Sequence, residues 1–296
     1  MEKKISIIGV PMDFGQLHRG VDMGPAAARY TGLVSELRCL GYRVEDKGDV
    51  TVSVRDPGGD VKNQDYLQEI ISVCEQVYQA GRDAVQQGCF PLFLGGDHSI
   101  SMGTAGGISH DGPIGLIWID AHADFNNFET SPSGNIHGMP VAALTGHAED
   151  QLVNIGRNGA KIDPENIVMI GIRQIDREER KRLKKSGITV YTMRDIDEQG
   201  ISTIANKAMM KFVHMKRVHV SLDMDALDPV EAPGVGTPVP GGLTYREAHL
   251  LMEIISDSKK LVSMDLVEIN PILDQANKTA KLAVDLTVSA LGKSIM

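Results

Sequence analysis

The sequence predicts an α/β protein in which a mostly parallel sheet carries helices on both faces. Short apolar runs alternate with segments of helical periodicity along most of the chain. The runs are rich in Val, Ile and Leu and show no polar alternation, as expected of strands covered on both sides. The 296 residues can bury one large core, and no linker, repeat or low-complexity tract divides them. We therefore expect a single domain over residues 1–296.

The N-terminal part of the chain contains a strand and two helical segments. The strand is predicted at residues 5–10, and residues 24–29, with a proline in the first turn, open a helix. Residues 50–59 contain β-branched side chains and end in the turn signal Asp56-Pro57-Gly58-Gly59. Residues 64–87 then form a long amphipathic helix, because apolar side chains recur at helical spacing and a glycine follows.

The remaining strands are predicted from further apolar runs, at residues 90–94, 114–119, 167–172, 218–222 and 261–267. Helix-like sequence separates several of them, for example at residues 177–185 and 244–256. Two segments rich in proline, glycine or small polar residues interrupt this alternation, at 125–140 and 229–243. Both are predicted loops, and both follow strands that end in acidic residues.

Composition excludes several classes of function. Hydrophobic residues make up 42% of the chain and charged residues 23%, which is ordinary for a soluble globular protein. The net charge of −9 and the absence of a basic run argue against nucleic acid and anionic membranes as partners. No apolar run reaches membrane-spanning length. The three cysteines lack metal-type spacing and are expected to be reduced thiols, so we expect a cytoplasmic protein.

Polar clusters stand at the carboxyl ends of four predicted strands. They are Gly96-Asp97-His98, Asp120-Ala121-His122-Ala123-Asp124, Asp223-Met224-Asp225 and Glu268-Ile269-Asn270-Pro271. In open α/β sheets this edge binds ligands, so the four clusters are expected to meet. Alternate residues of an extended chain point to one side, which gives the second cluster a face of two carboxylates and one imidazole. Buried without a partner, such groups would be strongly destabilising.

These side chains predict a pair of bound divalent cations. Four aspartates bring four negative charges, and two histidines can bind as neutral imidazoles. Two divalent cations balance those charges, with room for a shared water between ions about 3.5–4 Å apart. Oxygen-rich ligand sets favour hard ions, and a minority of imidazole favours Mn²⁺ over Mg²⁺, with Zn²⁺ also open. The predicted metal residues are His98, Asp120, His122, Asp124, Asp223 and Asp225.

Three motifs resemble the signatures of the ureohydrolase family. They are Gly95-Gly96-Asp97-His98-Ser99, the aspartate–histidine run at 120–124, and Ser221-Leu222-Asp223-Met224-Asp225-Ala226-Leu227-Asp228-Pro229. The similarity extends over nearly the whole chain, and Ser133-Gly134-Asn135-Ile136-His137-Gly138 resembles the bacterial arginases in particular. This resemblance implies a three-layer α/β/α sandwich around an eight-stranded parallel sheet, assembled as a homotrimer or hexamer.

The resemblance also implies two Mn²⁺ ions and a reaction. One ion would be held by His98, Asp120, Asp124 and Asp223, and the other by Asp120, His122, Asp223 and Asp225. The implied reaction is hydrolysis of L-arginine to L-ornithine and urea by a hydroxide that bridges the two ions.

Three residues would then perform the remaining catalytic tasks. Glu268 would pair with the guanidinium of arginine and hold its carbon over the hydroxide. Asp124 would carry the proton of the nucleophile to the leaving amine. His137, in a loop beside glycine, would exchange protons with solvent or product, because imidazole changes charge near neutral pH.

Polar residues that match the arginase pattern would recognise the far end of the substrate. Three neutral side chains of the 125–140 loop would donate to the α-carboxylate, and two acids after the 167–172 strand would accept from the α-ammonium group. A threonine of the 229–243 loop is expected to be a further contact. These residues are Asn126, Ser133, Asn135, Asp176, Glu179 and Thr237. The chain departs from the animal arginases at Gln174, where they often carry an acidic residue.

Other functions stay open on the same residues. Agmatinase is the nearest alternative, although decarboxylated arginine would not use the carboxylate donors of the 125–140 loop. Guanidinobutyrase and formimidoylglutamase are further possibilities on this scaffold. A dinuclear phosphoesterase or deacetylase would be a different class, and the lack of an Arg/Lys-rich phosphate cradle among the strand-end motifs argues against the phosphoesterase. A protein that binds metal without catalysis would release no urea.

Overall fold

The computed structural model describes residues 4–55 and 63–293, and eight strands of this part form one sheet in the order β2-β1-β3-β8-β7-β4-β5-β6. Every pairing between neighbouring strands is parallel. The strands are β1 (Lys4–Val10), β2 (Arg43–Asp49), β3 (Cys89–Gly95), β4 (Gly115–Ile119), β5 (Ile167–Ile172), β6 (Thr189–Thr192), β7 (Val218–Asp223) and β8 (Leu261–Val267). The predicted fold class is confirmed.

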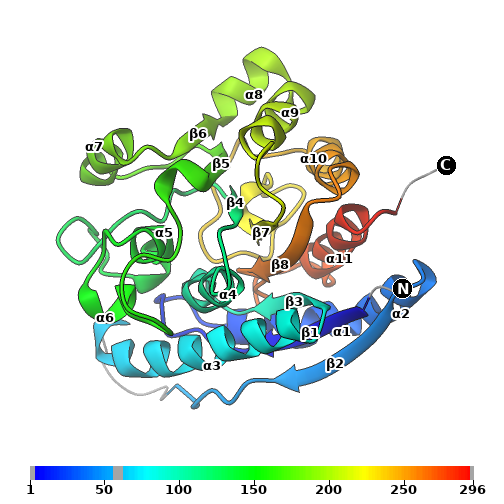
Figure 1. Ribbon diagram of the computed structural model, residues 1–296, viewed down its shortest axis with the longest axis horizontal. Coiled ribbons are helices and arrows are strands. Elements are labelled where there is room, and N and C mark those ends of the chain that lie inside the picture. The colour runs from blue at the N-terminus through cyan, green and yellow to red at the C-terminus, as the bar shows by residue number, and fades with distance from the viewer. Residues whose placement is uncertain (1–3, 56–62, 294–296) are drawn as a thin grey trace.

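Helices cover both faces of the sheet and complete the three layers (Figure 1). One layer contains α3 (Leu67–Gln86), α4 (Ser101–Ile108), α5 (Pro140–Leu144), α6 (Asp150–Val153) and α7 (Arg177–Ser186). The other contains α1 (Gly24–Tyr30), α2 (Leu33–Cys39), α8 (Met193–Gln199), α9 (Ile201–Lys211), α10 (Tyr245–Asp257) and α11 (Lys278–Ala290).

Each helical layer encloses its own apolar core, and the alternation of side chains along each strand divides them. In β4, Leu116 and Trp118 belong to the core under α3 and α4, whereas Ile117 and Ile119 belong to the core under α9 to α11. These four side chains are fully buried. The central strands are therefore apolar on both faces, which is why they are recognisable in the sequence as uninterrupted hydrophobic runs.

The strands predicted from apolar runs are all present, and their bounds differ from the predicted ones by at most one residue. The two edge strands, β2 and β6, were not predicted from the sequence. β2 has the sequence Arg-Val-Glu-Asp-Lys-Gly-Asp and is mostly exposed, and β6 has only four residues. Edge strands need no apolar pattern on both faces, and charged side chains protect them from pairing with other chains. The predicted turn at residues 56–59 lies outside the described residues.

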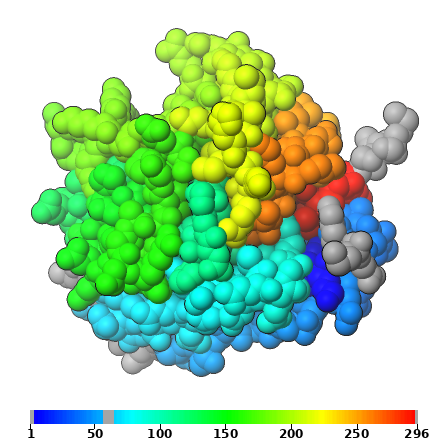
Figure 2. Space-filling view, in the orientation of Figure 1, coloured from blue at the N-terminus to red at the C-terminus, as the bar shows by residue number. Residues whose placement is uncertain are grey.

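The C-terminal helix closes the fold against the N-terminal helices. α11, in red, lies beside α2, in blue, in the space-filling view (Figure 2). The Tyr42 hydroxyl donates to the Leu291 carbonyl across 2.8 Å, and the Lys293 Nζ lies 2.9 Å from Glu36 Oε2. In the described part of the chain, no helix combines the length and the apolar character that crossing a membrane requires.

The four strands that end in polar clusters are neighbours in the centre of the sheet, in the order β3-β8-β7-β4. Because all of them are parallel, their carboxyl ends lie at one edge. Short 3₁₀ helices follow two of the ends, His98–Ile100 two residues after β3 and Met224–Ala226 directly after β7. The Asp97 and Asp223 side chains cap these helices by accepting from the second following backbone N–H.

Candidate metal centre and substrate pocket

Two histidines and four aspartates from three strand ends meet at this edge of the sheet. Among the described residues, their ligand atoms form two groups that share Asp120, and in each group the atoms lie within 4.8 Å of one another. The first group is His98, Asp120 and Asp223, and the second is Asp120, His122 and Asp225. Asp124, the remaining predicted metal residue, lies beside the first group, with its Oδ2 3.2 Å from His98 Nδ1.

The His98 ring is oriented for metal binding. The side chain is fully buried, and its Nδ1 lies 3.1 Å from Asp120 Oδ2 and 3.1 Å from Asp223 Oδ2. This nitrogen makes no hydrogen bond within the described chain, whereas Nε2 is 2.8 Å from the Ser221 hydroxyl. A buried ring nitrogen without a hydrogen bond, facing several carboxylates, matches the geometry of a metal ligand.

Hydrogen bonds fix the orientation of the aspartates. Asp120 Oδ2 accepts from the Trp118 indole N–H across 2.9 Å, and Oδ1 accepts from the His122 backbone N–H across 2.6 Å. Asp225 Oδ2 accepts from the Thr237 hydroxyl across 3.1 Å and lies 3.0 Å from His122 Nδ1. The carboxylates are thus preorganised around the space between the two groups.

The electrostatics of the cluster fit divalent cations. Burial opposes protonation of His122, but the charges of Asp225 and Asp120 outweigh it and raise the pKa of His122 to about 12. Burial and the Asp120 charge raise the pKa of Asp124 to about 6, and burial with Asp225 and Asp120 raises the pKa of Asp223 well above its ordinary value. These raised pKa values show that the cluster carries excess negative charge. Bound cations would neutralise that charge in place of the protons.

Two of the candidate catalytic residues have strained backbones. Asp124 has φ 48° and Glu268 has φ 62°, both in the left-handed region that side chains other than glycine rarely adopt. Each such residue costs on the order of 1–3 kcal/mol and persists only where its surroundings impose it. The Asp124 carbonyl accepts from the Val141 backbone N–H across 3.1 Å, and the Glu268 N–H donates to the Gly96 carbonyl across 2.9 Å. Backbone strain at two positions on one edge of the sheet supports a functional role for both residues.

Glu268 is buried and its carboxylate is held from several sides. Oε1 accepts from the His98 backbone N–H across 3.0 Å and lies 2.9 Å from His137 Nδ1, and Oε2 accepts from the Gln16 amide across 2.6 Å. Burial would raise the pKa of Glu268, but the His137 charge and these hydrogen bonds lower it overall. Glu268 thus stays ionised behind His137, which itself faces the pocket.

His137 lies in the 3₁₀ helix Ile136–Gly138, between Glu268 and the pocket. Its backbone N–H donates to the Gly15 carbonyl across 3.1 Å, which fixes the loop. Burial opposes protonation of the ring, but the Glu268 and Asp124 charges raise the pKa of His137 to about 9. The imidazole is therefore a cation near neutral pH and has a proton to donate.

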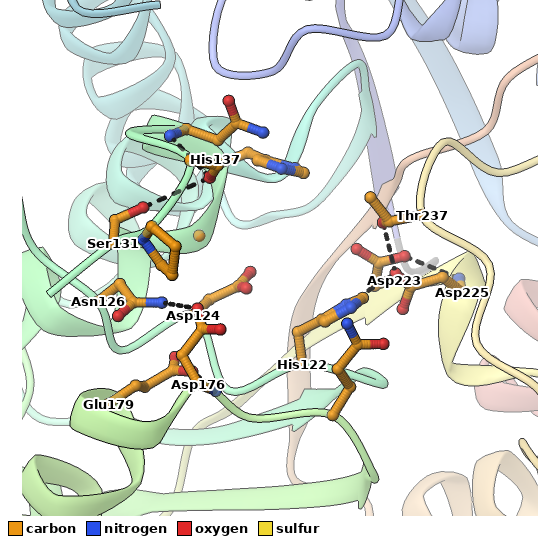
Figure 3. A pocket seen from close by; sticks show the side chains of 15 residues that line it. His122, Asp124, Asn126, Ser131, His137, Asp176, Glu179, Asp223, Asp225 and Thr237 are labelled. Atoms are coloured by element: carbon orange, nitrogen blue, oxygen red, sulfur yellow. Dashed lines mark hydrogen bonds and ion pairs between the residues drawn. The ribbon is translucent and has the colours of Figure 1, made fainter.

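An open, polar pocket lies above the two metal groups, and Figure 3 shows its walls. His122, Asp223 and Asp225 lie across it from Asn126, Asp176 and Glu179. All six residues predicted to bind substrate line it. The lining consists of His122, Asp124, Asn126, Ser131, Pro132, Ser133, Asn135, His137, Gly138, Gln174, Asp176, Glu179, Asp223, Asp225 and Thr237.

The two acids predicted to bind the α-ammonium group differ in their surroundings. Glu179 is buried, and its oxygens accept from the backbone N–H groups of Phe125, across 2.8 Å, and Asp176, across 3.1 Å. Burial raises the pKa of Glu179 to about 7 despite these bonds. Asp176 is half-buried and accepts from the Asn126 amide across 3.0 Å. Asp176 is the more accessible acceptor, and Glu179 joins α7 to the loop after β4.

Several residues of this site were not predicted from the sequence. Gln16 contacts Glu268 across 252 positions of the chain, and no local pattern marks it. Ser131 lines the pocket beside Ser133 and could have been included with the other polar residues of its loop. Ser221 interrupts the apolar run of β7, and a hydroxyl in a strand buried on both faces is a signal that could have been used.

Comparisons with known proteins agree with this geometry. The family model described as "Arginase family" matches residues 3–292. An arginase of Bacillus subtilis (strain 168) is 49% identical over 300 residues, with 100% of each chain covered. The native structure of the arginase from Bacillus caldovelox is similar with a TM-score of 0.96 at 46% identity, with 100% of each chain covered. The Entamoeba histolytica arginase in complex with L-ornithine has a TM-score of 0.92 at 32% identity, covering 99% of this chain and 100% of that one. The chain therefore belongs to the arginase family.

Proposed function

We propose that this protein is an arginase, which hydrolyses L-arginine with water to L-ornithine and urea. The observation that carries the proposal is the pair of histidine–aspartate groups that share Asp120 beneath a polar pocket. Membership of the family and the curated arginases of similar sequence support the reaction. The ornithine complex of the E. histolytica relative supports an amino acid as the ligand of the pocket.

The metal centre is proposed to hold two Mn²⁺ ions. The number follows from the two groups and from the four aspartate charges, and the identity from an oxygen-rich donor set with two imidazoles. When bound, such a pair of ions lowers the pKa of a coordinated water toward about 7 and so supplies a nucleophile at neutral pH. One ion is assigned to His98, Asp120, Asp124 and Asp223, and the other to Asp120, His122, Asp223 and Asp225.

The guanidinium of arginine is proposed to pair with Glu268. The carboxylate is ionised and anchored by Gln16 and the His98 backbone, so it can present a fixed negative charge. A guanidinium that approaches from the pocket meets His137 first, since that ring faces the pocket and contacts Glu268 Oε1. The guanidinium can therefore pair with Glu268 only if the His137 ring moves away from Glu268 Oε1.

Proton transfer is assigned to Asp124 and His137. Asp124 lines the pocket beside His98, and it is proposed to take the proton of the nucleophile and pass it to the leaving amine. His137 holds a proton near neutral pH and faces the same pocket, so it can exchange that proton with the product or with solvent.

The outer part of the pocket is proposed to select arginine by its α-carboxylate and α-ammonium groups. Neutral donors on one loop would bind the carboxylate, and acids at the start of α7 would bind the ammonium. Thr237, which bonds Asp225, would contact the reacting end of the substrate. The residues assigned to the α-substituents are Asn126, Ser133, Asn135, Asp176 and Glu179. Agmatine lacks the carboxylate and would leave its donors unused.

Three broader assignments accompany this function. We propose that residues 1–296 form one catalytic domain, that the protein is cytoplasmic, and that it assembles as a homotrimer or hexamer. The net charge of −9 argues against nucleic acid and anionic membranes as partners. Size-exclusion chromatography with light scattering would test the assembly.

The decisive experiment combines metal analysis with a urea assay. Purified protein is expected to contain two Mn²⁺ per subunit and to release urea from arginine much faster than from agmatine. Faster hydrolysis of agmatine would overturn the substrate assignment. Bound metal without urea release from either compound would overturn the catalytic assignment.

A further inference from the structure

A line of buried polar side chains leads from His98 away from the pocket and into the sheet. His98 Nε2 lies 2.8 Å from the Ser221 hydroxyl, which lies 3.1 Å from the Ser101 hydroxyl. The Ser101 hydroxyl donates to Asp265 Oδ2 across 3.2 Å. All four side chains are fully buried. Polar groups removed from water are destabilising unless each is paired, so this line calls for a functional explanation.

Asp265, at the inner end of the line, can only accept hydrogen bonds. Besides Ser101, its Oδ2 receives the Thr104 hydroxyl across 2.5 Å and lies 3.1 Å from His219 Nε2. Burial opposes ionisation of Asp265, but the charge of His219 and its hydrogen bond to Asp265 lower the pKa of Asp265 below its ordinary value. An ionised carboxylate offers acceptors and no donor.

This acceptor sets the direction of every hydrogen bond in the line. A serine hydroxyl has a single proton, and the Ser101 proton goes to Asp265. The Ser101 oxygen must then accept from Ser221, whose own proton is thereby committed. The Ser221 oxygen can consequently only accept from His98, so Nε2 of that ring carries a proton. Nδ1 is then the nitrogen left to bind a metal ion.

We propose that Asp265, acting through Ser101 and Ser221, is a positioning residue that keeps His98 in the tautomer that binds metal through Nδ1. The proposal rests on the proposed metal centre. The Trp118 ring stacks on His98 with centroids 3.9 Å apart and planes at 6°, so the ring plane is fixed from a second side. Partners that orient a metal-binding histidine typically change metal affinity about 10–100-fold when they are removed.

The line of hydroxyls reaches only one of the two metal groups. It ends on His98, which belongs to the group with Asp120 and Asp223. His122, in the other group, is half-buried and lies 3.0 Å from Asp225 through its Nδ1. Interrupting the line should therefore weaken binding of one Mn²⁺ ion much more than the other.

The test compares Ser221→Val with Ser221→Thr. The two variants add similar bulk to β7, and only Thr keeps a hydroxyl. Mn²⁺ binding to the metal-free proteins is followed by the electron paramagnetic resonance signal of free Mn²⁺, with the unfolding temperature measured alongside. We expect Ser221→Val to bind one ion about 10–100-fold more weakly and Ser221→Thr to stay within about threefold of the wild type. Ser101→Val and Ser101→Thr provide a second pair if the first does not fold.

A matched control is Thr104→Val. It removes another hydroxyl from the same Asp265 oxygen but leaves the path from His98 to Asp265 complete. Both Mn²⁺ affinities of this variant should match those of the wild type. Equal losses in the Val and Thr variants, or equal weakening of both ions, would overturn the positioning role alone. A wild-type protein that binds no Mn²⁺ would overturn the metal centre as well.

Discussion

At the scale of single residues, the pocket depends on side chains whose protonation and orientation are imposed by neighbours. The six predicted metal residues are packed so closely that His98 and His122 hold protons far more firmly than free imidazole does. Asp124 and Glu268 keep strained backbones at the same edge. Such strain and such shifted pKa values concentrate where function demands them. The residues most worth testing are therefore those that hold Glu268 and the aspartates in place.

The first prediction concerns the charge of Glu268. Glu268→Gln keeps the shape but removes the negative charge proposed to bind the guanidinium, so kcat/KM for arginine should fall by about 10²-fold or more. Steady-state kinetics at saturating Mn²⁺ measure this. Glu45→Gln, at an exposed position of β2, is the control and should leave kcat/KM unchanged. An unaltered kcat/KM in Glu268→Gln would remove Glu268 from the site.

The second prediction concerns Gln16, which the sequence analysis did not identify. Gln16→Met fills a similar volume but cannot donate to Glu268 Oε2, so the carboxylate should lose part of its orientation. We expect KM for arginine to rise about tenfold while Mn²⁺ affinity stays at the wild-type value, since one charge-assisted hydrogen bond contributes about 1.5–3 kcal/mol. Gln79→Met, on the exposed face of α3, is the control. Normal KM in Gln16→Met would contradict this role.

At the scale of elements, the site depends on how closely β1 and β3 approach at their ends. The Gly96 and Asp97 backbone N–H groups donate to the carbonyls of Val10 and Met12, each across 2.8 Å. A Cβ atom on Gly96 would lie 1.9 Å from the Met12 carbonyl oxygen. Backbone packing therefore requires the glycine of the Gly96-Asp97-His98 motif. This packing fixes the position of Asp97 and His98 at the carboxyl edge of the sheet.

The third prediction follows from this contact. Gly96→Ala should destabilise the protein by about 1–3 kcal/mol or more, because neither backbone segment can move without breaking these hydrogen bonds. Urea unfolding of the metal-free protein gives the free energy of unfolding. Gly138→Ala is the stability control, since a Cβ there meets no atom within 4 Å among the described residues. A stability within about 0.5 kcal/mol of the wild type in Gly96→Ala would contradict the packing argument.

At the scale of the whole molecule, the sheet brings together buried acids whose charge is only partly offset by His98 and His122 within the described part of the chain. Asp120, Asp223 and Asp225 are each at most 3% exposed, and they come from strands separated by about a third of the chain. Bound cations would convert their mutual repulsion into attraction across β4 and β7. The proposed metal centre should accordingly contribute to the stability of the entire fold.

The fourth prediction is that removing the proposed Mn²⁺ ions lowers the unfolding temperature. At free Mn²⁺ one hundred times its dissociation constant, each site adds about 2.7 kcal/mol to the free energy of unfolding. Differential scanning calorimetry before and after chelation measures the change, and adding Mn²⁺ back should restore the original temperature. Asp120→Asn, which alters the carboxylate shared by both groups, should show a much smaller response to Mn²⁺. A wild-type unfolding temperature that is the same with and without Mn²⁺ would contradict the prediction.

The sequence by itself determined the central architecture and the identity of the six candidate metal residues. Strands buried on both faces carry uninterrupted apolar runs, and acids placed directly after such runs stand out because burial without partners is unfavourable. The edge strands β2 and β6 were not predicted, because exposed or very short strands need no such pattern. Only the tertiary structure decided that Gln16 contacts Glu268 and that Ser221 contacts His98. It also decided that Glu268 lies behind His137. These relations join positions more than a hundred residues apart, and no local periodicity encodes which distant side chain will face a given strand end.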